Sequence, residues 1–249
     1  MCLLIFVMVL FSFYHPEAAI KAIIFDCDGI LVDTEELKFQ AWKTVLQTRD
    51  IFLSFEDYQP LIGGTGLSIL NQIAKEHNIT LDPRIVDEKN ELYWVLQKNE
   101  LKSIAPMIEV IEWVKTKHEE KEILLGVATS ASRNEVFFNL DYLKIRDLFD
   151  VILSGKDDLT KYKNPFGVNK PQPYIYLEMS HRLGIQPGEC LVLEDSEPGV
   201  CAAKSAGCKV IAVPTNWTMD QNFENADLVL RSANAHQLIE NIQYFLQEQ

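Results

Sequence analysis

Cysteine and basic residues are scarce in this chain of 249 residues, and each shortage disfavours a class of protein. The 5 cysteines are an odd number, and they form neither a Cys-x-x-Cys pair nor the Cys/His spacing of a metal site. This argues against disulfides and zinc, and it favours a reducing, cytoplasmic location. The chain has 23 Lys and Arg against 36 Asp and Glu, a formal net charge of -13, so nucleic acid is not an expected partner.

The N-terminus lacks an apolar run long enough to cross a membrane. Residues 1–14 are apolar and uncharged, but a spanning helix needs about 20 residues. A secretory signal would begin with positive charge and end in small residues, whereas the first lysine is Lys21 and the run continues into His15-Pro16-Glu17. We expect no membrane span; a targeting segment is the alternative to an extra packed segment or an over-extended start.

Short apolar strands alternate with helical stretches over most of the remaining chain. Helical spacing is found, for example, at residues 108–118 and 173–183. This alternation predicts an α/β fold, with a Rossmann-like parallel sheet covered by helices on both faces. The predicted strands are residues 21–25, 123–129, 151–154, 190–193, 210–213 and 228–230.

One long segment, residues 34–103, shows helical spacing only. Its amphipathic stretches are interrupted by Gly63-Gly64-Thr65-Gly66, which indicates a turn. We therefore predict a core domain made of residues 1–33 and 104–249, with residues 34–103 inserted as a helical cap domain. Residues 156–169, rich in Asp, Lys and Asn, are predicted to form a long loop.

Two aspartates follow the first predicted strand, at a turn that Gly29 supplies. Asp26 and Asp28 are two residues apart, so both can face one crevice at different depths. Asp26 could attack a phosphorus centre, while Asp28 protonates the leaving oxygen and later activates water. The alternative is a solvated turn that carries two acids.

A second acidic pair, Glu194 and Asp195, follows the strand predicted at residues 190–193. Ligands of parallel sheets bind at the carboxyl ends of the strands, so this pair should meet Asp26 there. Gathered carboxylates repel one another unless a cation joins them, and oxygen ligands beside a phosphate favour Mg2+. The alternative is that the pair caps a helix that begins near Pro198.

Three further residues could bind a phosphate group. Thr129 and Ser130 close the strand predicted at residues 123–129, and a helix start there would present N–H groups to a phosphate oxygen. Lys170, followed by Pro171, could balance the negative charge of the phosphoryl group and of the acids. Such residues often only cap helices or face solvent, but their shared position near strand ends favours one site.

Four short motifs resemble, in the same order, those of the haloacid dehalogenase superfamily: Asp26-Cys27-Asp28-Gly29, Thr129, Lys170-Pro171, and Glu194-Asp195-Ser196 with Gly199-Val200. The resemblance covers about residues 21–230. Asp33-Thr34-Glu35 and the helical insert are similar to the subgroup of β-phosphoglucomutase, phosphoglycolate phosphatase and related sugar-phosphate phosphatases. The resemblance to this superfamily implies a Rossmann-like core with a C1-type cap, Mg2+ as cofactor, and a small phosphorylated metabolite as substrate.

The resemblance also implies a role for each motif residue. Asp26 would be the nucleophile and a metal ligand, and Asp28 the acid/base, with its backbone carbonyl on Mg2+. Glu194 and Asp195 would lie on the metal side. The implied phosphate ligands are Thr129, Ser130 (through its backbone N–H) and Lys170. An aspartate at position 28 also distinguishes this chain from true dehalogenases.

The helical insert bears on the choice between phosphatase and phosphomutase. Lys89 resembles a lysine with which the cap of β-phosphoglucomutase reaches the sugar phosphate, and this favours a mutase. Gly66 stands where that mutase has an arginine for the distal phosphate, and Lys38 replaces a histidine common in the subgroup. A missing bidentate phosphate ligand should weaken the binding of a bisphosphate, so we predict hydrolysis through an aspartyl-phosphate. A phosphomutase, or a catalytically silent phosphate-binding protein, is the alternative.

Overall fold

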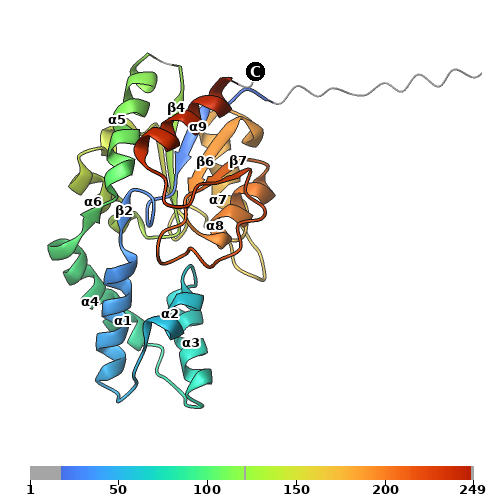
Figure 1. Ribbon diagram of the computed structural model, residues 1–249. Helices are drawn as coiled ribbons and strands as arrows, with labels where there is room; N and C mark the ends of the chain where they lie inside the picture. The colour runs from blue at the N-terminus through green and yellow to red at the C-terminus, as the bar shows by residue number, and fades with distance from the viewer. Residues whose placement is uncertain (1–17, 121, 248–249) are drawn as a thin grey trace, which may run out of the picture.

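A parallel sheet of six strands lies at the centre of the structure, a computed structural model that describes residues 18–120 and 122–247 (Figure 1). The strand order is β5-β4-β1-β6-β7-β8, and every neighbouring pair is parallel. The strands are β1 (Ala22–Phe25), β4 (Leu124–Thr129), β5 (Val151–Ser154), β6 (Cys190–Glu194), β7 (Lys209–Ala212) and β8 (Leu228–Val229).

Alternate residues of the central strands pack against opposite faces of the sheet, as the two-residue period of a strand requires. In β1, Ile23 and Phe25 belong to one apolar cluster, which includes Val110 of α5 (Ala105–Glu119). Ile24 belongs to a second cluster on the other face, with Met179 of α7 (Tyr174–Leu183). Because both faces are covered, the central strands are continuous apolar runs, and the predicted α/β fold is confirmed.

The remaining core helices complete these two layers (Figure 1). The layer with α5 also contains α6 (Arg133–Leu143) and α9 (Ala235–Gln247), and the layer with α7 contains α8 (Glu197–Ala206). Short 3-10 turns lie at η2 (Arg146–Leu148) and η3 (Pro187–Glu189).

A helical lobe within residues 34–103 leaves the core between two short strands. β2 (Val32–Asp33) and β3 (Lys102–Ser103) pair antiparallel, so the chain enters and leaves the lobe at one place. Figure 1 shows the lobe at one end of the sheet, below the core in this view. The lobe contains α1 (Glu35–Gln47), α2 (Phe55–Tyr58), η1 (Gln59–Leu61), α3 (Gly66–Glu76) and α4 (Ile85–Glu100).

The lobe has an apolar cluster of its own, with Trp42, Tyr58 and Ile73 among its buried members. Polar side chains cap its helices: Ser54 forms a capping box with Asp57 at α2, and Thr65 accepts from the N–H of Ser68 at α3. The helices of the lobe thus pack mainly on one another, although the lobe also contacts the core at Trp217.

The long loop and the membrane span considered from the sequence can be compared with the structure. Residues 156–169 contain neither helix nor strand, which agrees with the predicted long loop. Within residues 18–120 and 122–247, no helix has both the length and the apolarity needed to cross a membrane. The apolar run at residues 1–14 lies outside the described residues.

Candidate active site

The carboxyl ends of β4, β1 and β6 lie side by side because these strands are neighbours in the sheet. Thr129 is the last residue of β4, Asp26 directly follows β1, and Glu194 is the last residue of β6. The backbone N–H of Asp26 still donates to the carbonyl oxygen of Leu193 at 3.0 Å. This continuation of the ladder fixes Asp26 beside Glu194 at the edge of the sheet.

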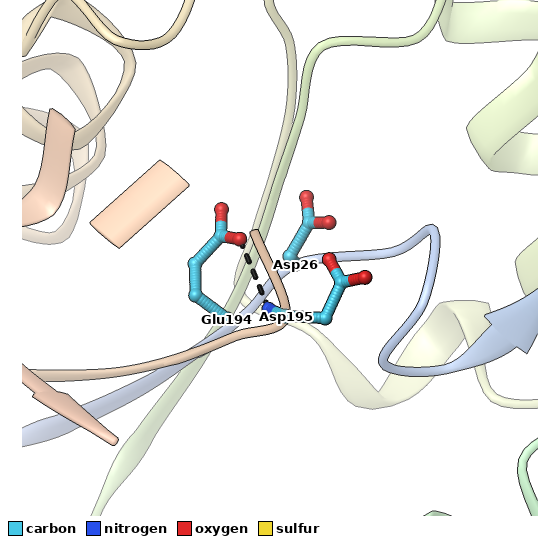
Figure 2. Close-up of side chains that lie close together, drawn as sticks. All are labelled: Asp26, Glu194 and Asp195. Atoms are coloured by element: carbon cyan, nitrogen blue, oxygen red, sulfur yellow. Dashed lines mark hydrogen bonds between the residues drawn. The ribbon is translucent and has the colours of Figure 1, made fainter. Parts of the chain in front are cut away.

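Three buried acids gather at this edge: Asp26, Glu194 and Asp195 (Figure 2). One carboxylate oxygen of each lies within 4.8 Å of the others, so a single cation could contact all three. Together with the ammonium group of Lys170, the ionised carboxylates leave two negative charges in excess. A buried set of oxygen donors with this charge fits a hard divalent cation such as Mg2+.

The electrostatics of the cluster point the same way. Burial raises the pKa of Asp26 from its usual 3.8 to about 7; the Lys170 ammonium group lowers it, and the charges of Glu194 and Asp28 raise it further. Burial, followed by the charges of Glu194 and Asp26, raises the pKa of Asp195 well above its usual value. Without a cation, Asp26 and Asp195 therefore resist ionisation.

Lys170 lies between two of the acids. Its ammonium group donates to Oδ1 of Asp26 at 2.7 Å, to Oε1 of Glu194 at 2.5 Å and to the carbonyl oxygen of Ala128 at 3.0 Å. Burial lowers the pKa of Lys170, but the charges of Asp26 and Glu194 outweigh it, so the pKa lies well above its usual range. Lys170 is therefore a permanent cation in contact with Asp26.

Two glycines leave the space that the acids occupy. A Cβ atom built on Gly199 would lie 1.9 Å from a carboxylate oxygen of Glu194, and one on Gly29 would lie 2.2 Å from Oδ2 of Asp195. Gly29 also has a φ of +80°, which favours glycine. The glycines in the first and fourth motifs thus have a steric reason: any side chain there would displace an acid.

Asp28 faces a different set of partners from Asp26. Its carboxylate accepts from Oγ1 of Thr34 at 2.7 Å and from Oγ1 of Thr129 at 3.4 Å, and Nζ of Lys38 lies 3.7 Å away. It lies outside the group of three acids that could hold an ion.

Thr129 and Ser130 lie where the chain passes from β4 to α6. Thr129 is buried, and its Oγ1 accepts from the N–H of Ala131 at 3.1 Å. Ser130 is exposed. Helix α6 follows, and its N-cap residue Ser132 forms a capping box with Glu135. The hydroxyl group of Thr129 thus lies at the end of β4, between the N–H of Ala131 and the carboxylate of Asp28.

Lys89 lies on α4 of the helical lobe, apart from the acids. Its ammonium group is 4.9 Å from the ring centroid of Tyr93 and 5.7 Å from that of Trp42. Burial, with repulsion from Lys38, lowers its pKa to about 8. Among residues 18–120 and 122–247, its ammonium group has no hydrogen bond or ion pair with a side chain.

The structure adds contacts that the motifs did not indicate. The hydroxyl group of Tyr176 donates to Oε1 of Glu194 at 2.8 Å, and Thr34 is the nearest donor to Asp28. Tyr176 lies in the apolar pattern of α7, where a tyrosine is indistinguishable from an ordinary core residue. Thr34 was visible only as part of the Asp33-Thr34-Glu35 resemblance.

Comparison with known proteins assigns the chain to a family. A model of the haloacid dehalogenase-like hydrolase family matches residues 23–213, so the chain belongs to that family. A phosphorylated carbohydrates phosphatase of Thermotoga maritima is 34% identical over 196 residues, 77% of this chain and 83% of that protein. The resemblance stated from the motifs is confirmed, and the chain is an enzyme of the hydrolase class.

Two other similar proteins carry different activities in their names. Fructose-1-phosphate phosphatase YqaB of Escherichia coli is 29% identical over 192 residues, which are 77% of this chain and 95% of that protein. The solved structure of β-phosphoglucomutase of Clostridium difficile matches with a TM-score of 0.70 and 26% identity, covering 92% of this chain and 98% of that chain.

Proposed function

We propose that this chain is a Mg2+-dependent phosphatase of a small sugar phosphate, and that Asp26 forms an aspartyl-phosphate intermediate. The observation that carries the proposal is the position of Asp26, at a strand end between Lys170 and two other buried acids. The similar phosphatases of carbohydrate phosphates from Thermotoga maritima and Escherichia coli support this substrate class.

Asp26 would act as the nucleophile. Its Oδ1 is held by Lys170, whereas its Oδ2 accepts no hydrogen bond from the described residues. Oδ2 would attack phosphorus, and the bond between phosphorus and the leaving oxygen would break. Lys170, Thr129 and the backbone N–H of Ser130 would bind the phosphoryl oxygens as this happens.

Asp28 would transfer the protons. In its protonated form it would donate a proton to the leaving oxygen, and as a carboxylate it would accept one from the water that attacks the aspartyl-phosphate. Its contacts with Thr34 and Thr129 hold the carboxylate in place for both steps. The products would be the dephosphorylated metabolite and inorganic phosphate.

Asp26, Asp195 and Glu194, with the backbone carbonyl of Asp28, would hold Mg2+. The bound ion would offset the charge of the gathered acids and of the phosphoryl group. Because Mg2+ favours the ionised carboxylates, it would also keep Asp26 in its nucleophilic form at neutral pH.

The helical lobe would act as a cap domain over the site, with residues 1–33 and 104–249 as the core domain. Lys89 supports this proposal because it is 8% exposed and its ammonium group has no acidic partner in the described chain. Closure of the lobe would bring a cation to the leaving group of the substrate and would exclude water during transfer.

A phosphomutase is the second candidate, favoured by Lys89 and by the similarity to β-phosphoglucomutase. Position 66 argues against it. Gly66 offers no side chain for a second phosphate, and a Cβ atom built there would lie 2.7 Å from Cγ1 of Val86, so a larger residue would require Val86 to move. This supports hydrolysis over the transfer of a phosphoryl group back to a sugar.

A panel of sugar phosphates and phosphoglycolate, assayed with Mg2+, separates the candidates. Release of inorganic phosphate supports the phosphatase, and isomerisation of a hexose 1-phosphate primed by its bisphosphate supports the mutase. If the chain shows neither activity on any substrate of the panel, the result supports a phosphate-binding protein. The Asp26→Asn variant, which keeps the size of the side chain, is the matched control and should show neither activity.

A further inference from the structure

The ammonium group of Lys170 has no hydrogen left for a substrate in this structure. Its three donors go to Asp26, Glu194 and the carbonyl oxygen of Ala128. A phosphoryl oxygen can bind Lys170 only by replacing one of these acceptors or by sharing a hydrogen with it. Replacement of an acceptor would leave a protein oxygen at this site with one donor fewer.

The two carboxylate acceptors of Lys170 differ in their other donors. Within residues 18–120 and 122–247, Oδ1 of Asp26 accepts from Lys170 alone. Oε1 of Glu194 accepts from Lys170 and also from the hydroxyl group of Tyr176, at 2.8 Å. Oε1 of Glu194 is thus the carboxylate oxygen that keeps a donor when Lys170 turns away.

The other half of the Glu194 carboxylate is already fixed. Oε2 accepts from the backbone N–H groups of Asp195 and Ser196, at 3.1 and 3.3 Å, and from Oγ of Ser196 at 3.1 Å. Glu194 is fully buried, so neither oxygen can turn to solvent for a replacement donor. Among the described residues, Tyr176 is thus the donor that remains to Oε1 when Lys170 is released.

Tyr176 is rigidly placed for this task. It is 1% exposed, and Nζ of Lys170 lies 5.3 Å from the centroid of its ring. The ring packs in the apolar cluster between α7 and the sheet, which directs the hydroxyl group at Glu194. The residue therefore touches both members of the ion pair from one side.

We propose that Tyr176 is a positioning residue that lets Lys170 pass from Glu194 to the phosphoryl group. The proposal rests on the proposed function, because it assumes a phosphate at this site. The hydroxyl group keeps the buried Glu194 oxygen hydrogen-bonded in both states. Without it, Lys170 would be the last donor to Oε1 and would be held there.

Tyr176→Phe tests the proposal because it removes the hydroxyl group and keeps the ring. Inorganic phosphate is titrated into the chain in the presence of Mg2+, and binding is measured by calorimetry. A hydrogen bond to a charged acceptor contributes enough that we expect phosphate to bind about 10- to 100-fold more weakly. Tyr162→Phe is the matched control, because the Tyr162 hydroxyl donates to Glu178 at 3.0 Å outside the site; its phosphate affinity should stay within about twofold of wild type.

A second comparison separates positioning from a general loss of packing. Glu194→Gln removes the ion pair with Lys170 and also a proposed Mg2+ ligand, so the single and double variants are compared with each other at the same Mg2+ concentration. In that background, adding Tyr176→Phe should weaken phosphate binding by less than about twofold more. The proposal would be overturned if Tyr176→Phe weakened phosphate binding by the same factor in the Glu194→Gln background as in the wild type. It would also be overturned if the Tyr176→Phe chain bound phosphate like wild type. Absence of phosphate binding by the wild type would overturn it as well.

The titration is independent of turnover. If the wild-type chain binds phosphate but hydrolyses no substrate of the panel, the proposed phosphatase function fails while the role of Tyr176 is still decided by the titration.

Discussion

Asp26 is a buried carboxylate whose protonation links the site to the stability of the protein. Its pKa is about 7 in the folded chain and 3.8 as its usual value, so between these pH values the folded state binds the proton and the unfolded state does not. Stability therefore falls as pH rises through this window, because the unfolded state binds fewer protons there.

We expect the Mg2+-free chain to show this loss of stability between about pH 4 and 7. Denaturant unfolding at several pH values measures it. Asp26→Asn should flatten the curve in this range, although Asp195, whose pKa is also raised, should keep part of the slope. A wild-type free energy of unfolding that rises steadily from about pH 4 to 7 would contradict the assignment of a raised pKa.

Gly199 provides a steric test at the same scale. In Gly199→Ala the new methyl group would overlap the Glu194 carboxylate, so we expect Glu194 to move, turnover to fall by about tenfold or more, and stability to fall by about 1–3 kcal/mol. Gly188→Ala is the control, because a Cβ there would have no neighbour closer than 3.8 Å. Kinetics and thermal unfolding measure both variants. Wild-type turnover in Gly199→Ala would show that the Glu194 carboxylate is not fixed as described.

At the scale of elements, an aromatic contact joins the helical lobe to the core. Trp217, which follows β7, packs against Phe39, Phe55 and Tyr58 of the lobe, with ring centroids 5.1–6.4 Å apart. Hydrogen bonds from Gln59 to Asp220 at 3.0 Å and from Gln221 to the carbonyl oxygen of Ile62 at 3.3 Å lie beside it. The lobe is thus held at a second place, away from its β2 and β3 connections.

Trp217→Ala should loosen the lobe. Removing a partly buried indole from three ring contacts should cost about 1–3 kcal/mol. Hydrogen exchange should quicken in α1 and α2, while the central strands keep their protection. Trp113→Ala, which truncates a partly buried tryptophan packed on the core, is the control and should not speed exchange in the lobe. Unchanged exchange in Trp217→Ala would mean that this contact does not hold the lobe.

The sequence predicted the elements of the core well because parallel strands covered on both faces are unbroken apolar runs. The prediction for residues 151–154 matches β5, and that for residues 190–193 is one residue shorter than β6. Glu194 was therefore placed after the strand rather than at its end. A polar residue ends the apolar run, but the backbone ladder continues through it.

The candidate site was predictable only where residues stand in short motifs at strand ends. Asp26 and Glu194 come together because β1 and β6 are neighbours, and Lys170 contacts both acids. The alternating pattern implies that the strands end at a shared edge, but it does not give this strand order. The contacts of Tyr176 and Trp217 were not predictable, because they depend on how side chains from distant segments pack. No local pattern distinguishes a tyrosine that donates to Glu194 from one that only fills the core.

At the scale of the whole molecule, a formal net charge of -13 and the buried acids both favour cation binding. If Mg2+ binds the folded chain but not the unfolded chain, it should raise the free energy of unfolding, by about 2.7 kcal/mol at a concentration 100 times the dissociation constant. EDTA should reverse the rise in melting temperature and abolish turnover. In Asp195→Asn, which removes one acid of the cluster, Mg2+ should have a smaller effect. A wild-type melting temperature insensitive to Mg2+ would contradict the metal site.

The central claim is that Asp26 carries the phosphoryl group during turnover. The most direct test is to quench the enzyme with acid during turnover of a sugar phosphate and to analyse its peptides by mass spectrometry. We expect a phosphoryl group on Asp26 in the wild type, and neither the modification nor turnover in Asp26→Asn. Substantial turnover by a folded Asp26→Asn chain would contradict the account.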